Sequence, residues 1–189
     1  MAANGCRGGG AVNLVLIGLR GCGKSSVGRY LAQMSKRPLL STDLLISYEQ
    51  GGRSIAEIVA ACQGDWRPFR DMEYEVARKV AALDGIIIDT GGGMVVDWDA
   101  QGQEIWSERK VSLLQRTGSL VWLQGDVQRL AAKVEGDCAR PALSDRLAVE
   151  EVMQRRLPFY QQAANFVVNI EGKTRKQLAR EIIQWFDEQ

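Results

Sequence analysis

The sequence predicts an α/β fold with a parallel sheet between layers of helices, and three features indicate this. Short apolar runs recur along the chain, and longer amphipathic stretches separate them. The runs lack alternating polar residues, which is typical of strands buried on both faces of a parallel sheet. A glycine-rich loop joins the first run to the first amphipathic stretch.

The individual elements follow from these runs in chain order. We expect strands over residues 14–17, 38–40, 85–88, 119–123 and 166–170, with 38–40 the weakest of them. The amphipathic stretches predict helices over 25–34, 66–83, 128–134 and 147–164, and a further helix over 105–118. Leu178, Ile182, Ile183 and Phe186 are spaced along one face of a C-terminal helix.

Length and charge limit the kind of protein this is. A chain of 189 residues is typical of one domain, so we expect a flexible tail over residues 1–11 and a single domain over 12–189. The formal net charge of +1 argues against nucleic acid or membrane held by bulk charge. No apolar run approaches the roughly 20 residues of a membrane span. We expect a cytoplasmic monomer.

The chain has no histidine, which excludes Ser-His-Asp and Cys-His nucleophile systems and every metal site that needs histidine. Proton transfer must then depend on a carboxylate or a lysine. The cysteines are far apart, with no C-x-x-C pair, and we expect free thiols. They are Cys6, Cys22, Cys62 and Cys138.

The stretch "GLRGCGKSS" matches the phosphate-binding loop pattern G-x-x-x-x-G-K-S/T between an expected strand and an expected helix. Glycines let successive backbone N–H groups point at phosphate oxygens, and the helix N-terminus adds its positive end. A plain glycine-rich turn is the alternative. We expect a site for ATP and Mg²⁺ at Gly18, Gly21, Cys22, Gly23, Lys24, Ser25 and Ser26, in which Lys24 bridges phosphates and Ser25 binds the metal.

Five further segments follow this loop: "LLSTDLLISYEQGGRSIAEI", "WRPFRDMEYEVA", "IIIDTGGGMV", "AAKVEGDCARPALSD" and "MQRRLPFYQQAANFVVN". In this order they resemble the motifs of the shikimate kinase family, from about residue 12 to the C-terminal helix. The resemblance implies a three-layer P-loop kinase fold with a central, mostly five-stranded parallel sheet, flanking helices and a mobile lid at about 134–146. It also implies transfer of the γ-phosphoryl group of ATP to the 3-hydroxyl of shikimate.

Asp43 matches the family's second aspartate in a D-S/T-D motif, which implies contact with the shikimate hydroxyls and acceptance of a proton. A carboxylate just past a strand end also lies where doubly wound sheets bind ligands. The alternative is that Asp43 only caps the following helix. The family's first aspartate is Ser41 here, a weaker partner for a hard cation. The candidate ligands for Mg²⁺ are therefore Ser25 by direct coordination and Asp89 or Ser41 through a water molecule.

Two arginines are candidates for the shikimate carboxylate. Arg70 matches the family's F-R-x-x-E motif, with Glu73 three residues on to orient it, and a surface ion pair is the alternative. Arg156 matches R-x-P-x-Y, so Arg155 should point elsewhere, and Pro158 predicts a kink or break in this helix. The glycines Gly91, Gly92 and Gly93 would let a polar ligand reach backbone N–H groups.

The lid segment contributes Arg140, which matches the arginine that reaches the transferred phosphoryl group in the family. A solvated loop charge is the alternative. Lys133 lies where the family often has an arginine stacked on adenine. The stretch "DWDAQGQE" differs from the family and is open between a surface hairpin, a contact site and no role.

Two rival functions stay open. One is a gluconate or nucleoside-monophosphate kinase, which shares the loop and sheet. The other is a family-like protein that binds without catalysis, for which Ser41 is the main support. The retention of Lys24, Asp43, Arg70, Arg140 and Arg156 argues against it.

Overall fold

The computed structural model describes residues 12–134 and 148–189. Its central sheet has five parallel strands in the order β2 (Leu39–Ser41), β3 (Ile87–Asp89), β1 (Asn13–Ile17), β6 (Gly118–Gln124) and β7 (Phe166–Asn169). The predicted α/β fold with a five-stranded parallel sheet is confirmed. All five apolar runs named from the sequence form its strands.

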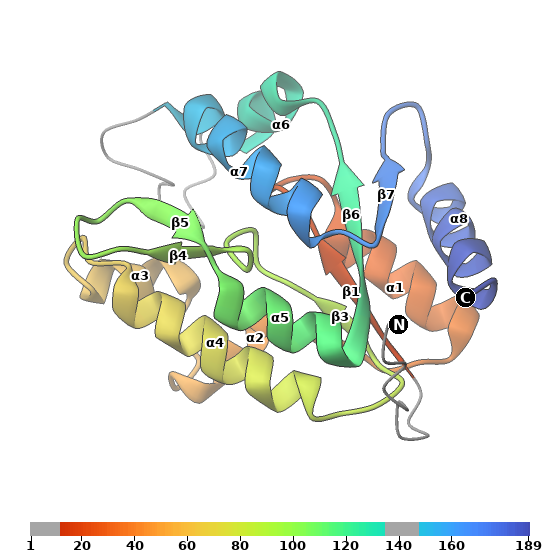
Figure 1. Cartoon of the computed structure of the whole chain (residues 1–189), viewed down its shortest axis with the longest axis horizontal. Coiled ribbons are helices and arrows are strands. Elements are labelled where there is room, and N and C mark those ends of the chain that lie inside the picture. Colours follow the sequence, from red (N-terminus) through yellow and green to blue (C-terminus); the bar gives the residue numbers. More distant parts are fainter. Residues whose placement is uncertain (1–11, 135–147) are drawn as a thin grey trace, which may run out of the picture.

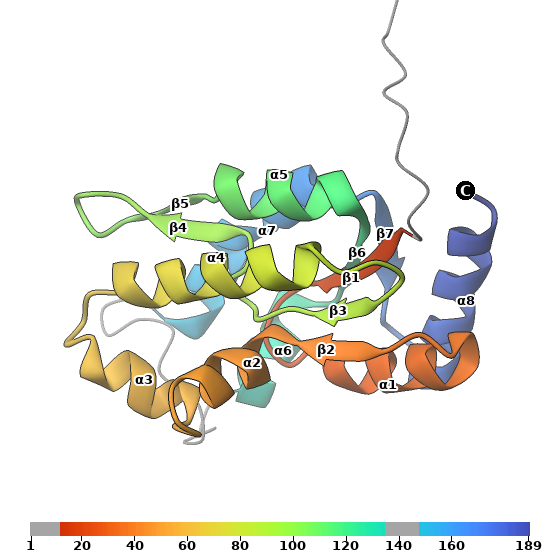
Figure 2. The ribbon, with the colours of Figure 1, turned by 90° about the horizontal axis from the view of Figure 1, so that it is seen from below.

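Helices cover both faces of this sheet (Figures 1 and 2). One face is covered by α1 (Lys24–Ser35) and α8 (Arg175–Asp187), and the other by α4 (Arg67–Ala81), α5 (Glu108–Thr117) and α7 (Val149–Ala163). The central strand β1 is buried along its whole length, which explains why its apolar run does not alternate. α7 continues through Pro158, so the predicted break does not occur.

The shorter helices lie around the carboxyl ends of the strands. They are α2 (Thr42–Glu49), α3 (Ile55–Ala61) and α6 (Val127–Val134). A capping box starts α3, because the Ser54 side chain accepts from the Glu57 backbone and the Glu57 side chain accepts from the Ser54 backbone. A local sequence signal therefore sets where α3 begins.

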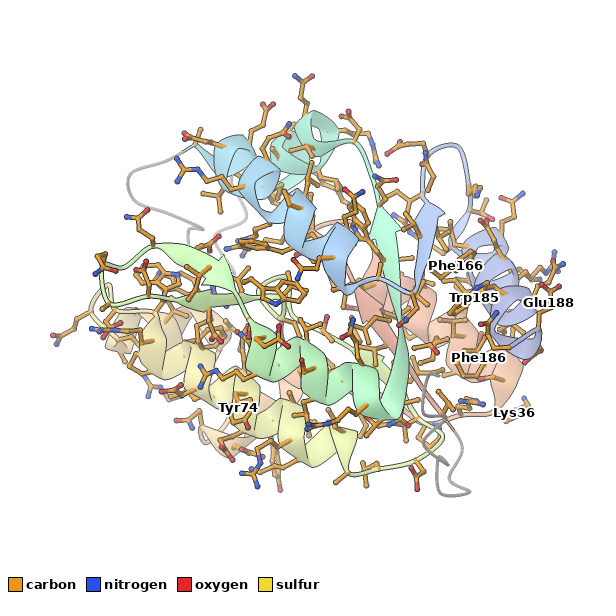
Figure 3. The ribbon with its side chains drawn as sticks, in the orientation of Figure 1. Lys36, Tyr74, Phe166, Trp185, Phe186 and Glu188 are labelled. Carbon is orange, nitrogen blue, oxygen red and sulfur yellow. The ribbon has the colours of Figure 1, made fainter. Side chains whose placement is uncertain are left out.

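Aromatic contacts fasten the C-terminal helix to the edge strand (Figure 3). The rings of Phe166 on β7 and Trp185 on α8 are stacked with centroids 4.6 Å apart. The guanidinium of Arg37 lies 4.7 Å from the centre of the Phe186 ring. The apolar stripe predicted for this helix faces inward, because Leu178 and Ile182 are fully buried.

The segment left open by the sequence contains a hairpin of β4 (Val96–Trp98) and β5 (Glu104–Trp106). Ile105 lies opposite Asp97 in this hairpin, so α5 begins at Glu108 and not at the predicted residue 105. β4 packs against α4, on the carboxyl side of the sheet (Figures 1 and 2). In the part of the chain that the structure describes, no helix has the length and apolar character to cross a bilayer.

Candidate active site

The carboxyl ends of the three neighbouring strands β1, β2 and β3 bring the predicted site segments to one edge of the sheet. The phosphate-binding loop follows β1, while Ser41 ends β2 and Asp89 ends β3. Asp89 lies in register with Leu16 on one side and with Ser41 on the other. Parallel strands bind ligands at this edge.

The phosphate-binding loop depends on glycine backbone geometry at its end. Gly21 and Gly23 have φ values of 82° and 98°, which other residues rarely adopt. Gly23 is the N-cap of α1, and a Cβ there would lie 2.7 Å from Cζ of Arg175. The loop therefore packs under the first residue of α8, a neighbour that the sequence motif does not reveal.

The side chain of Lys24 folds back over this loop. Its Nζ donates to the carbonyl oxygens of Gly18 at 2.8 Å and Leu19 at 3.1 Å, and the side chain is buried. Cys22 Sγ lies 3.7 Å from the same Nζ, within the buried core of the loop. A positive charge is thus held inside the ring of backbone groups where the phosphates of a nucleotide are expected.

The other predicted nucleotide residues surround the loop. Ser25 is exposed and Ser26 half-buried at the start of α1. Lys133 donates from Nζ to the carbonyl oxygen of Gly21 at 2.9 Å, so in this structure it contacts the phosphate-binding loop. Arg140 and nearly all of the expected lid lie outside the described residues.

A cavity of about 260 Å³ opens beside this loop. It is lined by Arg20, Asp43, Leu44, Ser47, Ser54, Ile55, Trp66, Phe69, Arg70, Glu73, Gly91, Gly92, Gly93 and Arg156. All six positions predicted to bind shikimate are among these residues, although up to 113 positions separate them in the chain (156 − 43). Arg20 belongs to the phosphate-binding loop, so the cavity and the loop share a wall.

Asp43 stands in the first turn of α2 at the wall of the cavity. The cap of α2 is Ser41, whose side chain accepts from Leu44 N at 3.5 Å, so the capping alternative for Asp43 is wrong. A Cβ on Gly91 would lie 2.4 Å from Asp43 Oδ1. The glycine therefore makes room for the carboxylate.

The Asp89 carboxylate fits a metal that is held through water. It is 5% exposed, and its Oδ1 is buried without a hydrogen-bond partner among the described residues. A buried carboxylate oxygen normally has a partner, so this atom is available to a water or ion. Ser41 is its register neighbour on β2, so the two candidates for contact with the metal through water lie side by side.

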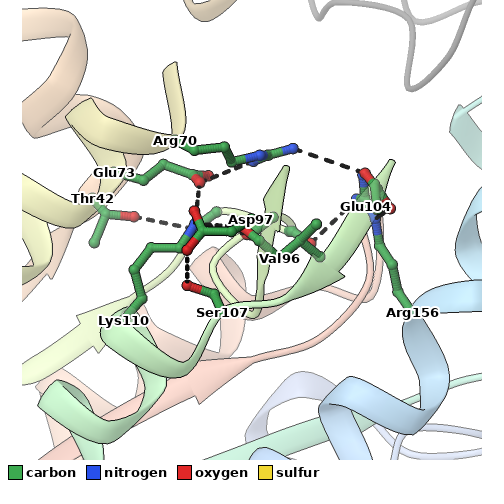
Figure 4. A network of polar contacts seen from close by, with 12 residues as sticks. Thr42, Arg70, Glu73, Val96, Asp97, Glu104, Ser107, Lys110 and Arg156 are labelled. Atoms are coloured by element: carbon green, nitrogen blue, oxygen red, sulfur yellow. Dashed lines mark hydrogen bonds and ion pairs between the residues drawn. The ribbon is translucent and has the colours of Figure 1, made fainter. Parts of the chain in front are cut away.

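Arg70 is held in a buried ion-pair network (Figure 4). Its Nη1 donates to Glu73 Oε2 at 2.9 Å, and Lys110 Nζ donates to the same oxygen at 2.8 Å. Arg70 and Glu73 are each 2% exposed and Lys110 is fully buried, so the surface ion-pair alternative is wrong. Burial alone would raise the pKa of Glu73, but the charges of Arg70 and Lys110 outweigh it and lower that pKa.

Arg156 approaches the same cavity from α7 and is 3% exposed. Its Nε donates to Glu104 Oε2 at 2.9 Å, its Nη2 donates to Glu104 Oε1, and its Nη1 donates to the Gly92 carbonyl at 3.3 Å. Burial lowers the pKa of Arg156, but the hydrogen bonds and charge of Glu104 raise it above the usual value. Arg155 is exposed and points away from Arg156, as predicted, and it pairs with Glu151.

The T-G-G-G segment makes room for two side chains of the cavity. Gly91 N already donates to Thr42 Oγ1 at 3.0 Å, and the Gly92 carbonyl accepts from Tyr160 Oη at 2.5 Å. A Cβ on Gly93 would lie only 2.0 Å from Arg70 Nη1. The glycines thus allow Asp43 and Arg70 to reach the cavity.

Several residues at this site were not predicted from the sequence. The aromatic rings of Trp66 and Phe69 lie 5.0 Å and 5.7 Å from the Arg70 guanidinium. Glu104 comes from the stretch that the sequence left open, and Lys110 comes from the helix predicted over 105–118. Nothing local marks a lysine or glutamate for burial. For Glu104, the sequence indicated only that a surface hairpin could form at this stretch.

Comparisons with known proteins identify the family of this chain. A family model described as shikimate kinase matches residues 20–187. A shikimate kinase from Leptospira biflexa is 40% identical over 174 residues, covering 92% of this chain and 95% of that protein. A solved shikimate kinase from Acinetobacter baumannii, in complex with shikimate, superposes with a TM-score of 0.79 at 24% identity and covers 94% of each chain. The chain described here therefore belongs to the shikimate kinase family.

Proposed function

We propose that this protein transfers the γ-phosphoryl group of ATP to the 3-hydroxyl of shikimate, giving shikimate 3-phosphate and ADP. The observation that supports this acceptor is the cavity in which Arg70, Arg156 and Asp43 meet beside the phosphate-binding loop. Two guanidinium groups suit a carboxylate, and one carboxylate suits a hydroxyl. Shikimate has a carboxylate and hydroxyl groups on one small ring.

Positioning is the main contribution of the cavity to this reaction, because phosphoryl transfer asks for little covalent chemistry from the protein. Arg70 and Arg156 hold the carboxylate end of the acceptor. Asp43 orients the reacting hydroxyl and accepts its proton as the new P–O bond forms. The chain has no histidine, so a carboxylate is the natural base.

The phosphate-binding loop holds the nucleotide on the other wall of the cavity. Lys24 leaves its loop carbonyls for the β- and γ-phosphates, and backbone N–H groups of the loop bind the remaining oxygens. Ser25 is the direct ligand for Mg²⁺, with Asp89 and Ser41 acting through water. When bound, Mg²⁺ neutralises charge on the phosphates. Arg140 is proposed to reach the transferred phosphoryl group and help exclude water.

The function is tested by measuring ADP release from purified protein with Mg-ATP, with and without shikimate, gluconate or AMP. We expect ADP formation to require shikimate. Stimulation by gluconate or AMP instead would overturn the acceptor. If ATP raised the melting temperature but no acceptor gave turnover, the protein would bind without catalysis.

A Gly93→Ala variant should lose acceptor binding. The new methyl group would displace the Arg70 guanidinium, which cannot approach a Cβ to the 2.0 Å found here. We expect the KM for shikimate to rise at least tenfold, while the KM for ATP changes little. Steady-state kinetics with each substrate varied in turn measure this.

Gly51→Ala is the matched control for Gly93→Ala. Nothing lies within 4 Å of a Cβ at Gly51, and its φ of 72° introduces only local strain. This variant should keep the wild-type KM for shikimate. An equal rise in both variants would show that the effect is not specific to Arg70.

An Asp89→Asn variant should need more Mg²⁺. The change removes the charge of a buried carboxylate whose Oδ1 has no partner in the described part of the chain. We expect the Mg²⁺ concentration for half-maximal rate to rise about 10–100-fold, the usual cost of losing an outer-shell ligand. Calorimetric titration with ATP should show that Mg²⁺ strengthens ATP binding less in the variant than in the wild type. An unchanged Mg²⁺ dependence would contradict the role of Asp89 at the metal site.

A further inference from the structure

The carboxylate of Glu104 lies between the two arginines that are proposed to bind the shikimate carboxylate. One edge of the Arg156 guanidinium makes two hydrogen bonds to it, through Nε and Nη2. Its Oε1 also lies 3.9 Å from Nη2 of Arg70. Figure 4 shows Glu104 between Arg70 and Arg156, on the β5 strand of the hairpin. No other described residue makes an ion pair with Arg156.

The exposed fractions of these side chains show which of them faces solvent. The side chains of Arg70 and Arg156 are 3% and 4% exposed, whereas that of Glu104 is 17% exposed. Arg70 and Arg156 line the cavity, and while Glu104 keeps both of its contacts, the Nε and Nη2 edge of Arg156 is not open to a second carboxylate. Arg156 has a third contact, to the Gly92 carbonyl, so few of its N–H groups are left for a second carboxylate.

We propose that Glu104 is an internal competitor for the acceptor carboxylate, holding Arg156 in the empty site and giving way when shikimate binds. The inference rests on the proposed function. An unpaired buried arginine is costly, so the empty protein needs a counter-ion at this place. The acceptor supplies its own carboxylate to the same arginines, and Glu104 then turns toward the solvent that it already reaches.

The hairpin that contains Glu104 is fixed to the rest of the site. Trp98, the register partner of Glu104, packs against Trp66 with ring centroids 6.2 Å apart. Trp66 in turn lies against Arg70. Asp97 of the same hairpin binds Arg109 at the base of α5. Because the backbone is anchored, displacement of Glu104 needs a rotation of its side chain only.

This arrangement makes Glu104 a specificity-determining residue. A ligand displaces Glu104 only if it interacts with Arg70 and Arg156 more favourably than the Glu104 carboxylate does. A carboxylate ligand meets this condition, and a neutral ring of the same size does not. The affinity for shikimate is consequently lower than two arginines alone would give.

The test is a Glu104→Gln variant, which keeps the size of the side chain and removes its charge. We expect the KM and the Kd for shikimate to fall roughly tenfold, because a charged competitor is lost. The KM for ATP should not change. The variant without ligand should melt below the wild type, and shikimate should raise its melting temperature by more than it raises that of the wild type.

The methyl ester of shikimate and a Glu108→Gln variant are the controls. The ester has no charge, so Glu104→Gln should not improve its binding. Glu108 is exposed at the start of α5, where it accepts from Trp106 and Ser112, and its substitution should leave all constants unchanged. If Glu104→Gln did not fold, Glu104→Asp should lower the KM by a smaller factor, because the shorter side chain cannot make both contacts to Arg156.

Three outcomes would overturn the inference. A KM for shikimate that is raised or unchanged in Glu104→Gln would show that Glu104 does not compete with the acceptor. Equal improvement for the acid and the ester would show a general loosening of the site. If the wild type neither bound nor phosphorylated shikimate, the proposed function would fail, and the inference with it.

Discussion

An Asp43→Asn variant is expected to lose about 10²–10⁴-fold in kcat for shikimate-dependent ADP release, the usual contribution of a general base. The amide keeps the size of the side chain beside Gly91, where a carboxylate oxygen and a Cβ could not both fit. The amide cannot accept the proton of the hydroxyl. The KM for shikimate should change much less than kcat, which steady-state kinetics at saturating Mg-ATP will show.

Glu49→Gln is the matched control for Asp43→Asn. Glu49 is at the exposed end of the same helix and pairs with Lys79 on the surface. Its substitution removes a carboxylate from α2 without touching the cavity, so kcat should stay at the wild-type value. A kcat for Asp43→Asn within threefold of the wild type would contradict the role of Asp43 as the base.

A Lys110→Met variant is expected to lower the free energy of unfolding by about 3–5 kcal/mol, the usual cost of removing one partner from a buried ion pair. Lys110 Nζ donates to Glu73 Oε2 at 2.8 Å and to the Val96 carbonyl at 2.5 Å. The methionine would leave both oxygens buried with fewer partners. Urea unfolding at pH 7, followed by tryptophan fluorescence, measures the change.

The matched control for Lys110→Met is Lys79→Met. Lys79 pairs with Glu49 at 2.7 Å, a similar distance, but its side chain is 59% exposed. Surface pairs contribute roughly 0–1 kcal/mol, so this variant should unfold almost as the wild type does. Equal losses in the two variants would mean that the burial of the Lys110 network does not matter to stability.

The five strands were predictable because each depends on a local signal. A strand buried on both faces needs consecutive apolar residues, and 14–17, 119–123 and 85–88 have them in the sequence itself. Even the weak run at 38–40 forms β2. The helix predicted from residue 105 begins three residues later, because the pairing of Ile105 with Asp97 is a contact across the hairpin. No local pattern indicates that contact.

In the candidate site, too, residues marked by local motifs were predictable, and roles that depend on distant contacts were not. The phosphate-binding loop, Asp43, Arg70 and Arg156 were named from short motifs, and the cavity gathers the last three in one place. The role of Ser41 could not be predicted from a short motif. Its hydroxyl caps α2, and it is also the register neighbour of Asp89, 48 positions away in the chain (89 − 41).

The sequence by itself determined the class of fold, the phosphate-binding loop and the residues at the strand ends, because these depend on neighbours within a few positions. Only the tertiary structure decided that Lys110 is fully buried and that Glu104 pairs with Arg156. Lysine and glutamate are surface residues by default, since desolvation of a charge is costly. Lys110 is stable in the interior, and Glu104 at its half-buried position, because the fold brings opposite charges to them from distant segments.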